Sequence, residues 1–377
     1  MGMSMKNVLL NNQFMLNAAF WWKCRIESKL RHGRPQQYKK PAWHMTERVV
    51  QECKQLHMAL IADEMTYQNF CTLCQIHLLS PQNWRDVLEK EKPDVFFCES
   101  AWSGTTEQKD CWRYQIYGRS GLWFENRKTL YDIIKYCREA GIPTVFWNKE
   151  DPAYFGDDAH NFVATASWFD FVLTTAEECI DAYHKMGFEN VGTMPFGYSP
   201  DLFYPLPGEF DCGRAVFFGS WYQDQPVRCQ DMIRLFDMVL DMGMNLEIYD
   251  RHAYTDEKRF TYPEKYRPYV RSGVSYIDIP STIGRPCYAI NVNTVMESET
   301  MYARRVLELM ACGCIIISNE SIGLRRRFGN RIWFCEDDFD NSQIEQIRTI
   351  NQEEVQLNDA WEIRLNSLFL QMGLIQQ

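Results

Sequence analysis

Polar residues able to do acid-base chemistry follow three short apolar runs in the first half of the chain. They are Asp63, Glu99 and the stretch Asn148, Lys149, Glu150 and Asp151. A poorly solvated carboxylate has a raised pKa and can take up a proton near neutral pH. A structural reading stays open for each acid, since Asp151 before Pro152 is a typical turn or cap residue.

A second group, in the other half of the chain, is suited to binding an anion. Gly219 and Ser220 follow an apolar run, and a glycine there lets the backbone approach a phosphate. Arg228, near the start of the next amphipathic stretch, can add a charge-assisted hydrogen bond. The signal is weak by itself, because a glycine turn after a strand is common.

The stretch 298–318 reads as a polar loop, a helix and a buried strand. A helix over 302–312 is indicated by apolar residues at helical spacing, and Gly313 suits its C-terminus. Thr300 and Met301 lie at the beginning of this helix, where free backbone N–H groups favour an anion. They form the second candidate anion site.

One acid, Glu308, lies inside this helix, one turn after Arg304 and Arg305. The spacings i,i+4 and i,i+3 allow a surface ion pair with either arginine. Alternatively, the two oxygens of Glu308 accept hydrogen bonds from the two hydroxyls of a ribose, with an arginine at a phosphate. The sequence leaves both readings open.

These residues are positioned by a regular alternation of apolar runs and helical stretches, which is typical of a parallel sheet covered on both faces. Such sheets bind ligands beyond the carboxyl ends of their strands, where the acids and Gly219 all fall. We predict an α/β fold of two doubly wound, Rossmann-like domains that face a cleft.

A proline-rich stretch divides the alternation into two sets. We predict an N-terminal domain over 1–200, a linker over 201–213 and a C-terminal domain over 214–355. The last segment, 356–377, is predicted to be a helix that packs back on the N-terminal domain.

Composition narrows the class of protein. The chain has 377 residues, of which 46% are hydrophobic, so it can build two cores. Its formal charge of −10 argues against a broad nucleic-acid footprint. The 14 cysteines follow no repeated spacing, which favours reduced thiols in a cytoplasmic protein. We expect no metal site, because one CxxC stands alone, and no transmembrane segment.

Five strings in the chain resemble a known family. They are IADEMTY (61–67), KPDVFFCESAWSG (92–104), GIPTVFWNKEDP (141–152), FDFVLTT (169–175) and INVNTVMESETMYARRVLELMACG (290–313). Together they look like glycosyltransferases of GT-B fold, and more closely like the CgeB-like, spore-maturation type of glycosyltransferase. The resemblance runs from about residue 57 to residue 330.

The resemblance implies that the C-terminal domain binds a nucleotide-sugar donor, such as a UDP- or GDP-sugar, and that no other cofactor is needed. The residues expected on the donor are Gly219, Ser220, Arg228, Thr300, Met301, Arg304, Arg305 and Glu308, with Glu308 on the ribose. The N-terminal domain is expected to bind the acceptor of the sugar through Glu99, Trp102, Asn148 and Lys149. Asp63, Glu150 and Asp151 are the candidates for moving the proton of the acceptor hydroxyl.

One position departs from the pattern. In the wider retaining group of these enzymes, an acid directly precedes the position of Met301 and contacts the donor sugar. Here that position is Thr300, and Glu299 lies beside it. The departure leaves open whether the sugar is transferred with retention or with inversion.

We therefore expect a metal-independent glycosyltransferase that acts on a glycan or glycoconjugate. One alternative is transfer to modified bases in DNA, as phage enzymes of similar fold do, which a basic segment over 29–40 leaves open. Another alternative is a non-catalytic binding protein with the same fold, for which Thr300 is the best argument.

Overall fold

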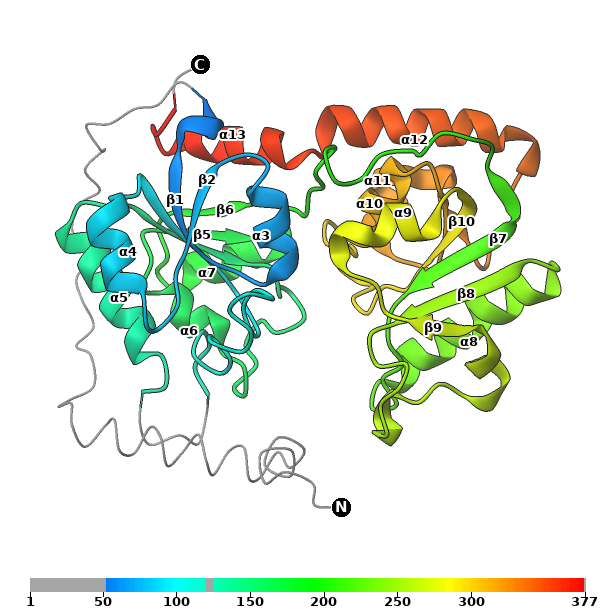
Figure 1. Ribbon diagram of the computed structural model, residues 1–377, viewed down its shortest axis with the longest axis horizontal. Helices are drawn as coiled ribbons and strands as arrows, with labels where there is room; N and C mark the ends of the chain where they lie inside the picture. The colour runs from blue at the N-terminus through cyan, green and yellow to red at the C-terminus, as the bar shows by residue number, and fades with distance from the viewer. Residues whose placement is uncertain (1–51, 120–124, 376–377) are drawn as a thin grey trace.

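The computed structural model describes residues 52–119 and 125–375. The basic segment 29–40 lies outside this part of the chain. Within it, the chain forms two α/β domains joined near residues 198 and 360 (Figure 1). The predicted fold class of two doubly wound domains is confirmed.

The N-terminal domain is built on a parallel sheet of six strands in the order β2-β1-β3-β4-β5-β6. The strands are β1 His57–Ile61, β2 Gln75–Leu78, β3 Val95–Glu99, β4 Thr144–Asn148, β5 Phe171–Thr174 and β6 Val191–Thr193. The helices are α3 Glu64–Phe70, α4 Trp84–Glu91, α5 Lys128–Glu139, α6 Phe162–Ala166 and α7 Ile180–Lys185.

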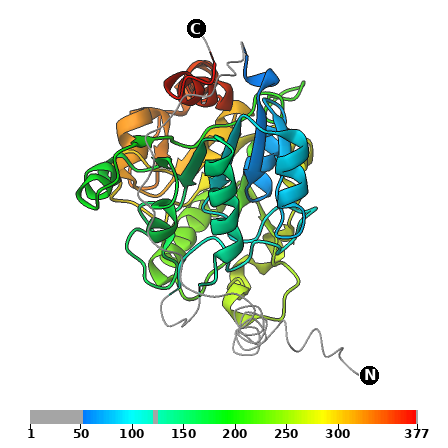
Figure 2. The ribbon, with the colours of Figure 1, turned by 90° about the vertical axis from the view of Figure 1, so that its left-hand side faces the viewer.

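Side chains of this sheet alternate between two cores because successive residues of a strand point to opposite faces. In β1, Ala59 and Ile61 pack on the face that α4 and α5 cover, whereas Met58 and Leu60 pack on the other face. Figure 2 looks onto this domain, with α4 and α5 toward the viewer. The fully buried central strands explain the apolar runs seen in the sequence.

The C-terminal domain also has a six-stranded parallel sheet, in the order β12-β11-β10-β7-β8-β9. The strands are β7 Asp211–Phe218, β8 Asn245–Asp250, β9 Val270–Ser272, β10 Pro286–Asn291, β11 Ile315–Ser318 and β12 Trp333–Phe334. The helices are α8 Pro226–Asp241, α9 Ile279–Ile283, α10 Arg305–Ala311, α11 Ile322–Phe328 and α12 Ile344–Asn358. Read from β9 to β12, the order is 3-2-1-4-5-6, that of dinucleotide-binding Rossmann domains.

Strand β7 begins at Asp211, inside the range 201–213 that the sequence suggested for the linker. The backbone N–H of Asp211 donates to Arg285 O at 2.8 Å, and Asp211 is in register with Pro286 across an irregularity in the ladder. Pairing with the neighbouring strand therefore extends β7 beyond its apolar part.

The last helix, α13 Trp361–Gln371, lies on the N-terminal domain (Figures 1 and 2). Trp361 contacts Phe70 and Trp147 edge to face, with ring centroids 5.2 and 5.3 Å apart. The two crossings between the domains run side by side, since Tyr198 N donates to Asp359 O and Trp361 N to Tyr198 O. A Cβ on Gly197 would lie 2.9 Å from the Trp361 ring, so this close approach requires glycine.

None of the helices in the described part of the chain is both long and apolar enough to cross a membrane.

We predict that Trp361→Ala lowers the free energy of unfolding by about 3–5 kcal/mol, because it leaves a large cavity against Phe70 and Trp147. Denaturant unfolding followed by circular dichroism measures this change. Leu357→Ala, at a side chain that is 72% exposed, is the matched control and should change it by less than about 0.5 kcal/mol. An unfolding midpoint of Trp361→Ala equal to that of the wild type would show that α13 does not belong to the N-terminal core.

Candidate functional site

Strands β1 and β3 bring Asp63 and Glu99 together at one edge of the N-terminal sheet. Lys149, which follows β4, lies between them, with its Nζ 2.9 Å from Asp63 Oδ2 and 2.9 Å from Glu99 Oε1. At this edge the strand order reverses between β1 and β3, a point where such sheets bind ligands. Three strands thus deliver charged groups to one edge, as predicted.

Asp63 is bonded on both of its oxygens. Oδ1 accepts hydrogen bonds from the N–H groups of Ser103 and Gly104, and Oδ2 accepts from Trp102 N and Lys149 Nζ. Burial raises its pKa, but Lys149 and the backbone donors outweigh burial and hold the pKa below its ordinary value. Asp63 is therefore a poor base. In this structure its hydrogen bonds clamp the loop after β3, and its catalytic role stays a prediction.

Glu99 has no exposed surface, so it does not contact a substrate in this arrangement. It accepts hydrogen bonds from Thr66 Oγ1 and Asp63 N, and burial raises its pKa in spite of Lys149. Lys149 keeps 14% side-chain exposure. Burial lowers the pKa of Lys149, but the surrounding carboxylates raise it well above its ordinary value. Glu99 completes the ion pair with Lys149, and its contact with an acceptor stays a prediction.

Glu150 is the acid of this edge that has no ion pair among residues 52–119 and 125–375. Its Oε1 accepts a hydrogen bond from Trp102 Nε1 at 2.8 Å. Burial raises its pKa, although Lys149 and Trp102 act in the opposite direction. Trp102 in turn packs edge-on against Tyr154 and His160, with centroids 5.1 and 5.3 Å apart. Glu150 is thus a carboxylate with a raised pKa beside a group of aromatic rings.

Tyr154 is one of the rings in this group. Burial raises its pKa, and the negative charges of Glu150 and of Asp224 in the other domain contribute to the rise. Charges of both domains thus act on Tyr154, at the aromatic group beside Glu150.

Asp151 and Asn148 turn in the other direction and are fully buried. Asp151 accepts hydrogen bonds from Asn148 Nδ2, Thr174 Oγ1 and Tyr183 OH at 2.6, 2.8 and 2.9 Å. Burial raises its pKa to about 7. Both side chains are bonded within the core, which is the structural reading that the sequence left open; the catalytic role of Asp151 and the substrate contact of Asn148 stay predictions.

In the C-terminal domain, the strand order reverses between β7 and β10. Gly219 follows β7, but its N–H donates to Tyr249 O and its carbonyl accepts from Tyr262 OH. A Cβ here would lie 2.5 Å from the Phe217 ring. The glycine is therefore needed for packing, and its backbone is not free to bind a phosphate as predicted. Ser220 is occupied as well, because its Oγ donates to Asp250 Oδ1.

Four arginines gather beyond these strand ends. They are Arg228 of α8, Arg251 after β8, Arg304 and Arg305. Burial lowers the pKa of Arg305 to about 10, and the charges of the other three arginines add to the decrease in spite of Glu308. Arg305 forms no ion pair within the described residues, and its Nε has no hydrogen-bond partner there. Burial also lowers the pKa of Arg228. This arginine cluster has more positive charge than its protein surroundings neutralise.

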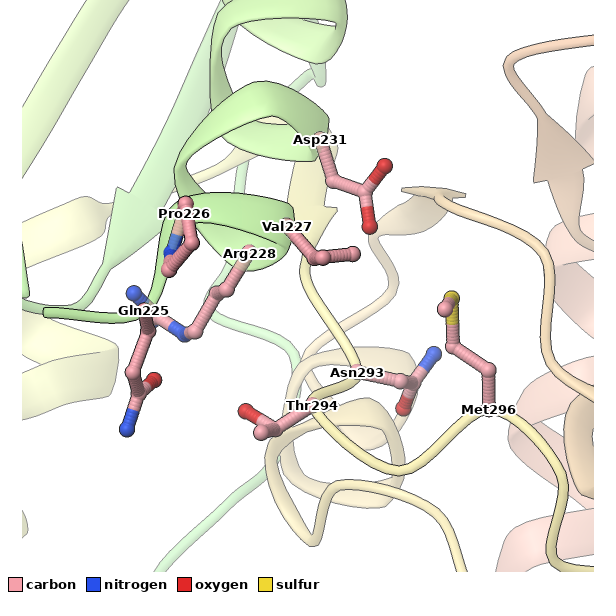
Figure 3. Close-up of a pocket in the computed structure, with 8 residues that line it drawn as sticks. All are labelled: Gln225, Pro226, Val227, Arg228, Asp231, Asn293, Thr294 and Met296. Carbon is pink, nitrogen blue, oxygen red and sulfur yellow. The ribbon is translucent and has the colours of Figure 1, made fainter.

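A cavity of about 190 Å³ adjoins the cluster, between the first turn of α8 and the loop after β10 (Figure 3). It is lined by Gln225, Pro226, Val227, Arg228, Asp231, Asn293, Thr294 and Met296. No side chain caps α8, so the N–H groups of its first turn and its dipole favour an anion at this end. Asp231, a buried acid in the wall of this cavity, already has a partner, because its Oδ2 accepts a hydrogen bond from Asn319 Nδ2 at 2.9 Å.

Glu308 is almost completely buried, with 1% exposure. Its Oε1 lies 2.9 Å from Arg304 Nε and accepts a hydrogen bond from Tyr276 OH at 2.6 Å. Its Oε2 has no partner in the described part of the chain. Of the two predicted ion pairs of Glu308, the one with Arg304 is present, whereas Arg305 forms no ion pair within the described residues. Glu308 is therefore neither a surface ion pair nor a fully satisfied core group.

Helix α10 begins at Arg305, three residues later than the sequence suggested. Side chains hold the preceding loop, because Ser298 Oγ accepts from Met301 N and Asn293 Oδ1 accepts from Ala303 N. Met301 packs against the core of the N-terminal domain. The predicted anion site at Thr300 and Met301 is therefore not at a helix N-terminus.

Thr300 makes its contacts across the domain interface. Its Oγ1 accepts a hydrogen bond from Glu177 N at 2.9 Å and donates to Glu178 Oε2 at 3.3 Å. Thr300 therefore links the two domains. Its hydroxyl is bonded to Glu177 and Glu178, at the position where the resemblance led us to expect an acid that contacts the donor sugar.

Two residues of the site were missed by the sequence reasoning. Arg251 directly follows the last residue of β8, so its position at a strand end could have identified it. Tyr276, the partner of Glu308, lies in an irregular stretch without periodicity, and no sequence signal points to it. Within 52–119 and 125–375, no group of three or more His, Cys, Asp or Glu side chains is arranged to hold a metal ion.

Comparison with known proteins identifies similar folds. No protein-family model and no curated protein matches the sequence significantly. Among solved structures, an alpha-glucosyltransferase in complex with UDP and a 13-mer DNA containing a HMU base has a TM-score of 0.58 at 8% identity, over 84% of this chain and 99% of that one. A DNA-modifying beta-glucosyltransferase has a TM-score of 0.50 at 11% identity, also over 84% and 99%. These likenesses establish the GT-B fold.

We predict that the buried acid Asp151 makes stability decrease as pH rises. Its pKa is about 7 when folded and near 3.8 in an unpaired carboxyl, so the folded state holds the extra proton between these values. Its stabilisation is fully present below pH 4 and is lost by about pH 7, up to about 4 kcal/mol. Denaturant unfolding of the wild type and of Asp151→Asn between pH 4 and 8 measures the difference, which should shrink or reverse with rising pH. Parallel pH profiles for the two proteins would contradict the assignment.

Proposed function

We propose that this protein transfers a sugar from a nucleotide-sugar donor to a hydroxyl group of an acceptor molecule. The observation that carries the proposal is the arginine cluster at the carboxyl ends of β7 and β10, in which Arg305 has no anionic partner among the described residues. Buried positive charge without compensation is costly, and a diphosphate would supply the missing anion.

The donor would lie along this strand edge. Arg305 and Arg228 would contact the diphosphate, and the free N–H groups at the start of α8 would add further donors. The unpartnered Oε2 of Glu308 is the remaining acceptor for a ribose hydroxyl. Either a UDP- or a GDP-sugar fits this chemistry. We propose that transfer needs no metal ion, because the guanidinium groups can neutralise the departing nucleoside diphosphate.

The proton would be taken by Glu150. As the acceptor oxygen bonds to the anomeric carbon, its proton passes to Glu150, the bond between that carbon and the phosphate oxygen breaks, and the diphosphate leaves with the electron pair. The raised pKa of Glu150 and its place beside Trp102 and Tyr154 support this role. Thr300 carries no carboxylate and is bonded to Glu177 and Glu178, so we propose a single displacement with Glu150 as the base, which inverts the anomeric centre.

For the acceptor we propose a glycan or glycoconjugate, because aromatic rings such as Trp102 and Tyr154 suit the apolar faces of sugars. The second candidate is DNA. The alpha-glucosyltransferase of the same fold is described with DNA containing a HMU base, and the beta-glucosyltransferase as a DNA-modifying enzyme. Transfer to duplex DNA, with affinity that falls steeply as salt rises, would select the second candidate.

Membership of the CgeB-like family and a cytoplasmic location belong to the same proposal. The first is supported by the strings around Glu150 and Glu308. The cytoplasmic location is supported by the cysteines of the described residues, which lie between Cys53 and Cys335 and are free thiols. A non-catalytic binding protein would use the same arginine cluster, and turnover of any donor excludes it.

We predict that the wild type binds UDP or GDP and that Arg305→Gln weakens this binding about 10- to 100-fold, since a buried charged hydrogen bond to phosphate is lost. Isothermal titration calorimetry in the presence of EDTA measures the affinity and also tests whether a metal is required. Arg271→Gln is the matched control, because Arg271 is exposed and contacts backbone carbonyls of its own segment. A wild type that binds no nucleotide would sink the proposal.

We predict that Glu150→Gln lowers turnover of the donor by about 10²- to 10⁴-fold and leaves nucleotide affinity unchanged. Activity of the wild type should rise with pH through a pKa above 4.5, because Glu150 must be ionised to accept the proton and burial raises its pKa. Hydrolysis or transfer assays with a panel of nucleotide sugars measure both effects. Glu107→Gln, at an exposed acid, serves as control. Full activity of Glu150→Gln would assign proton transfer to another group.

A further inference from the structure

A chain of buried hydrogen bonds crosses from the N-terminal domain to Glu308. Asn69 of α3 donates from Nδ2 to Tyr276 OH at 2.8 Å, and Tyr276 OH donates to Glu308 Oε1 at 2.6 Å. Arg304 Nε lies 2.9 Å from the same carboxylate oxygen. Asn69 and Glu308 are each 1% exposed, and Tyr276 is 8% exposed. Two groups of the C-terminal domain hold the carboxylate, and one of them, the Tyr276 hydroxyl, is in turn held by Asn69 of the N-terminal domain.

The direction of each hydrogen bond in this chain is fixed. Burial raises the pKa of Tyr276 well above its ordinary value, and the negative charge of Glu308 raises it further, so the hydroxyl keeps its proton. This single proton points to Glu308, and the hydroxyl oxygen accepts from Asn69. Asn69 is itself fixed, because its Nδ2 also donates to Met65 O at 2.7 Å. Tyr276 can therefore donate to Glu308 and accept from Asn69 only while the two domains are in contact.

Packing around the chain makes the same connection. Met65, next to Asn69 on α3, packs into the core of the C-terminal domain. The ring of Tyr276 packs on Phe203, with centroids 5.1 Å apart, and the guanidinium of Arg304 lies 5.3 Å from the centre of the Tyr276 ring. Burial lowers the pKa of Arg304, but Glu308 and Tyr276 outweigh burial and raise the pKa above its ordinary value, with smaller contributions from Glu99 and Asp63 of the N-terminal edge. Groups of both domains thus act on Arg304, the ion-pair partner of Glu308.

We propose that Tyr276 is a positioning residue that couples contact between the two domains to the orientation of Glu308 at the donor site. The inference rests on the proposed function, in which Glu308 contacts the donor. When the domains meet, Asn69 fixes the Tyr276 hydroxyl, and Tyr276 holds Oε1, which leaves Oε2 as the oxygen that receives the donor. When they part, the hydroxyl loses the hydrogen bond from Asn69, and Glu308 is held less rigidly, by Tyr276 and Arg304 of its own domain alone.

The experiment measures UDP and GDP affinity and donor turnover in Tyr276→Phe, Asn69→Ala and the double variant. Tyr276→Phe keeps the ring that packs on Phe203 and removes only the hydroxyl. We expect its nucleotide dissociation constant to rise about tenfold, the size of one lost hydrogen bond to a charged group. Asn69→Ala should weaken binding as well, although Asn69 lies in the other domain. The double variant should bind no more weakly than Tyr276→Phe, because both changes act through one hydroxyl.

Tyr288→Phe is the matched control, since Tyr288 is a buried tyrosine of the same domain whose hydroxyl lies near Asn341. Thermal unfolding of each variant separates stability from binding. A lowered Tm with unchanged nucleotide affinity in Tyr276→Phe would give the residue a purely structural role and overturn the inference. Wild-type affinity in Asn69→Ala, or additive losses in the double variant, would also overturn it. A wild type that binds no nucleotide would remove the proposed function together with this inference, and is thus distinguishable from these results.

Discussion

Positive charge that the protein does not neutralise is the constraint around which the C-terminal half of this molecule is arranged. Arg305 is partly exposed and lies near Arg304, Arg228 and Arg251; desolvation of its guanidinium and the neighbouring positive charges lower its pKa to about 10. Within the described residues, Arg304 is the one of these four arginines that has a carboxylate partner, Glu308. The reversal of strand order at β7 and β10 puts this cluster at the edge where Rossmann domains hold phosphates.

The N-terminal edge has the opposite character, because its charges are paired. Lys149 lies between Asp63 and Glu99, and backbone N–H groups satisfy the remaining oxygens of Asp63. Such a buried triad fixes the loops around it and leaves little freedom for proton transfer. Glu150 stands apart, since burial raises its pKa and, within the described residues, Trp102 is the group that bonds to it. The C-terminal domain therefore has arginines that lack carboxylate partners within the described residues. The N-terminal edge has one acid, Glu150, with a raised pKa and no ion pair there.

Much of this could be predicted from the sequence, and the failures have identifiable physical causes. Apolar runs that end in polar residues predicted the strands and the edge at which Asp63, Glu99 and Lys149 meet, because parallel strands share one carboxyl edge. The sequence could not separate Glu150 from Asp151. Neighbouring side chains leave a turn in different directions, and only the fold shows that Asp151 points to Tyr183 in the core.

The helix bearing Glu308 was predicted too long for a similar reason. Helical spacing does not reveal that Ser298 and Asn293 bond the backbone of the preceding loop and delay the helix to Arg305. The contacts of Glu308 with Tyr276, and of Thr300 with Glu177, join residues 32 and 123 positions apart. The first contact depends on the tertiary packing of the C-terminal domain and the second on how the two domains meet, and local patterns in the sequence specify neither.

The most direct test is a crystal structure of the protein with UDP or GDP bound. The account predicts that the diphosphate oxygens lie within hydrogen-bond distance of the guanidinium groups of Arg305 and Arg228, at the carboxyl ends of β7 and β10. A nucleotide bound elsewhere, with the arginine cluster unchanged and without an anion, would contradict it.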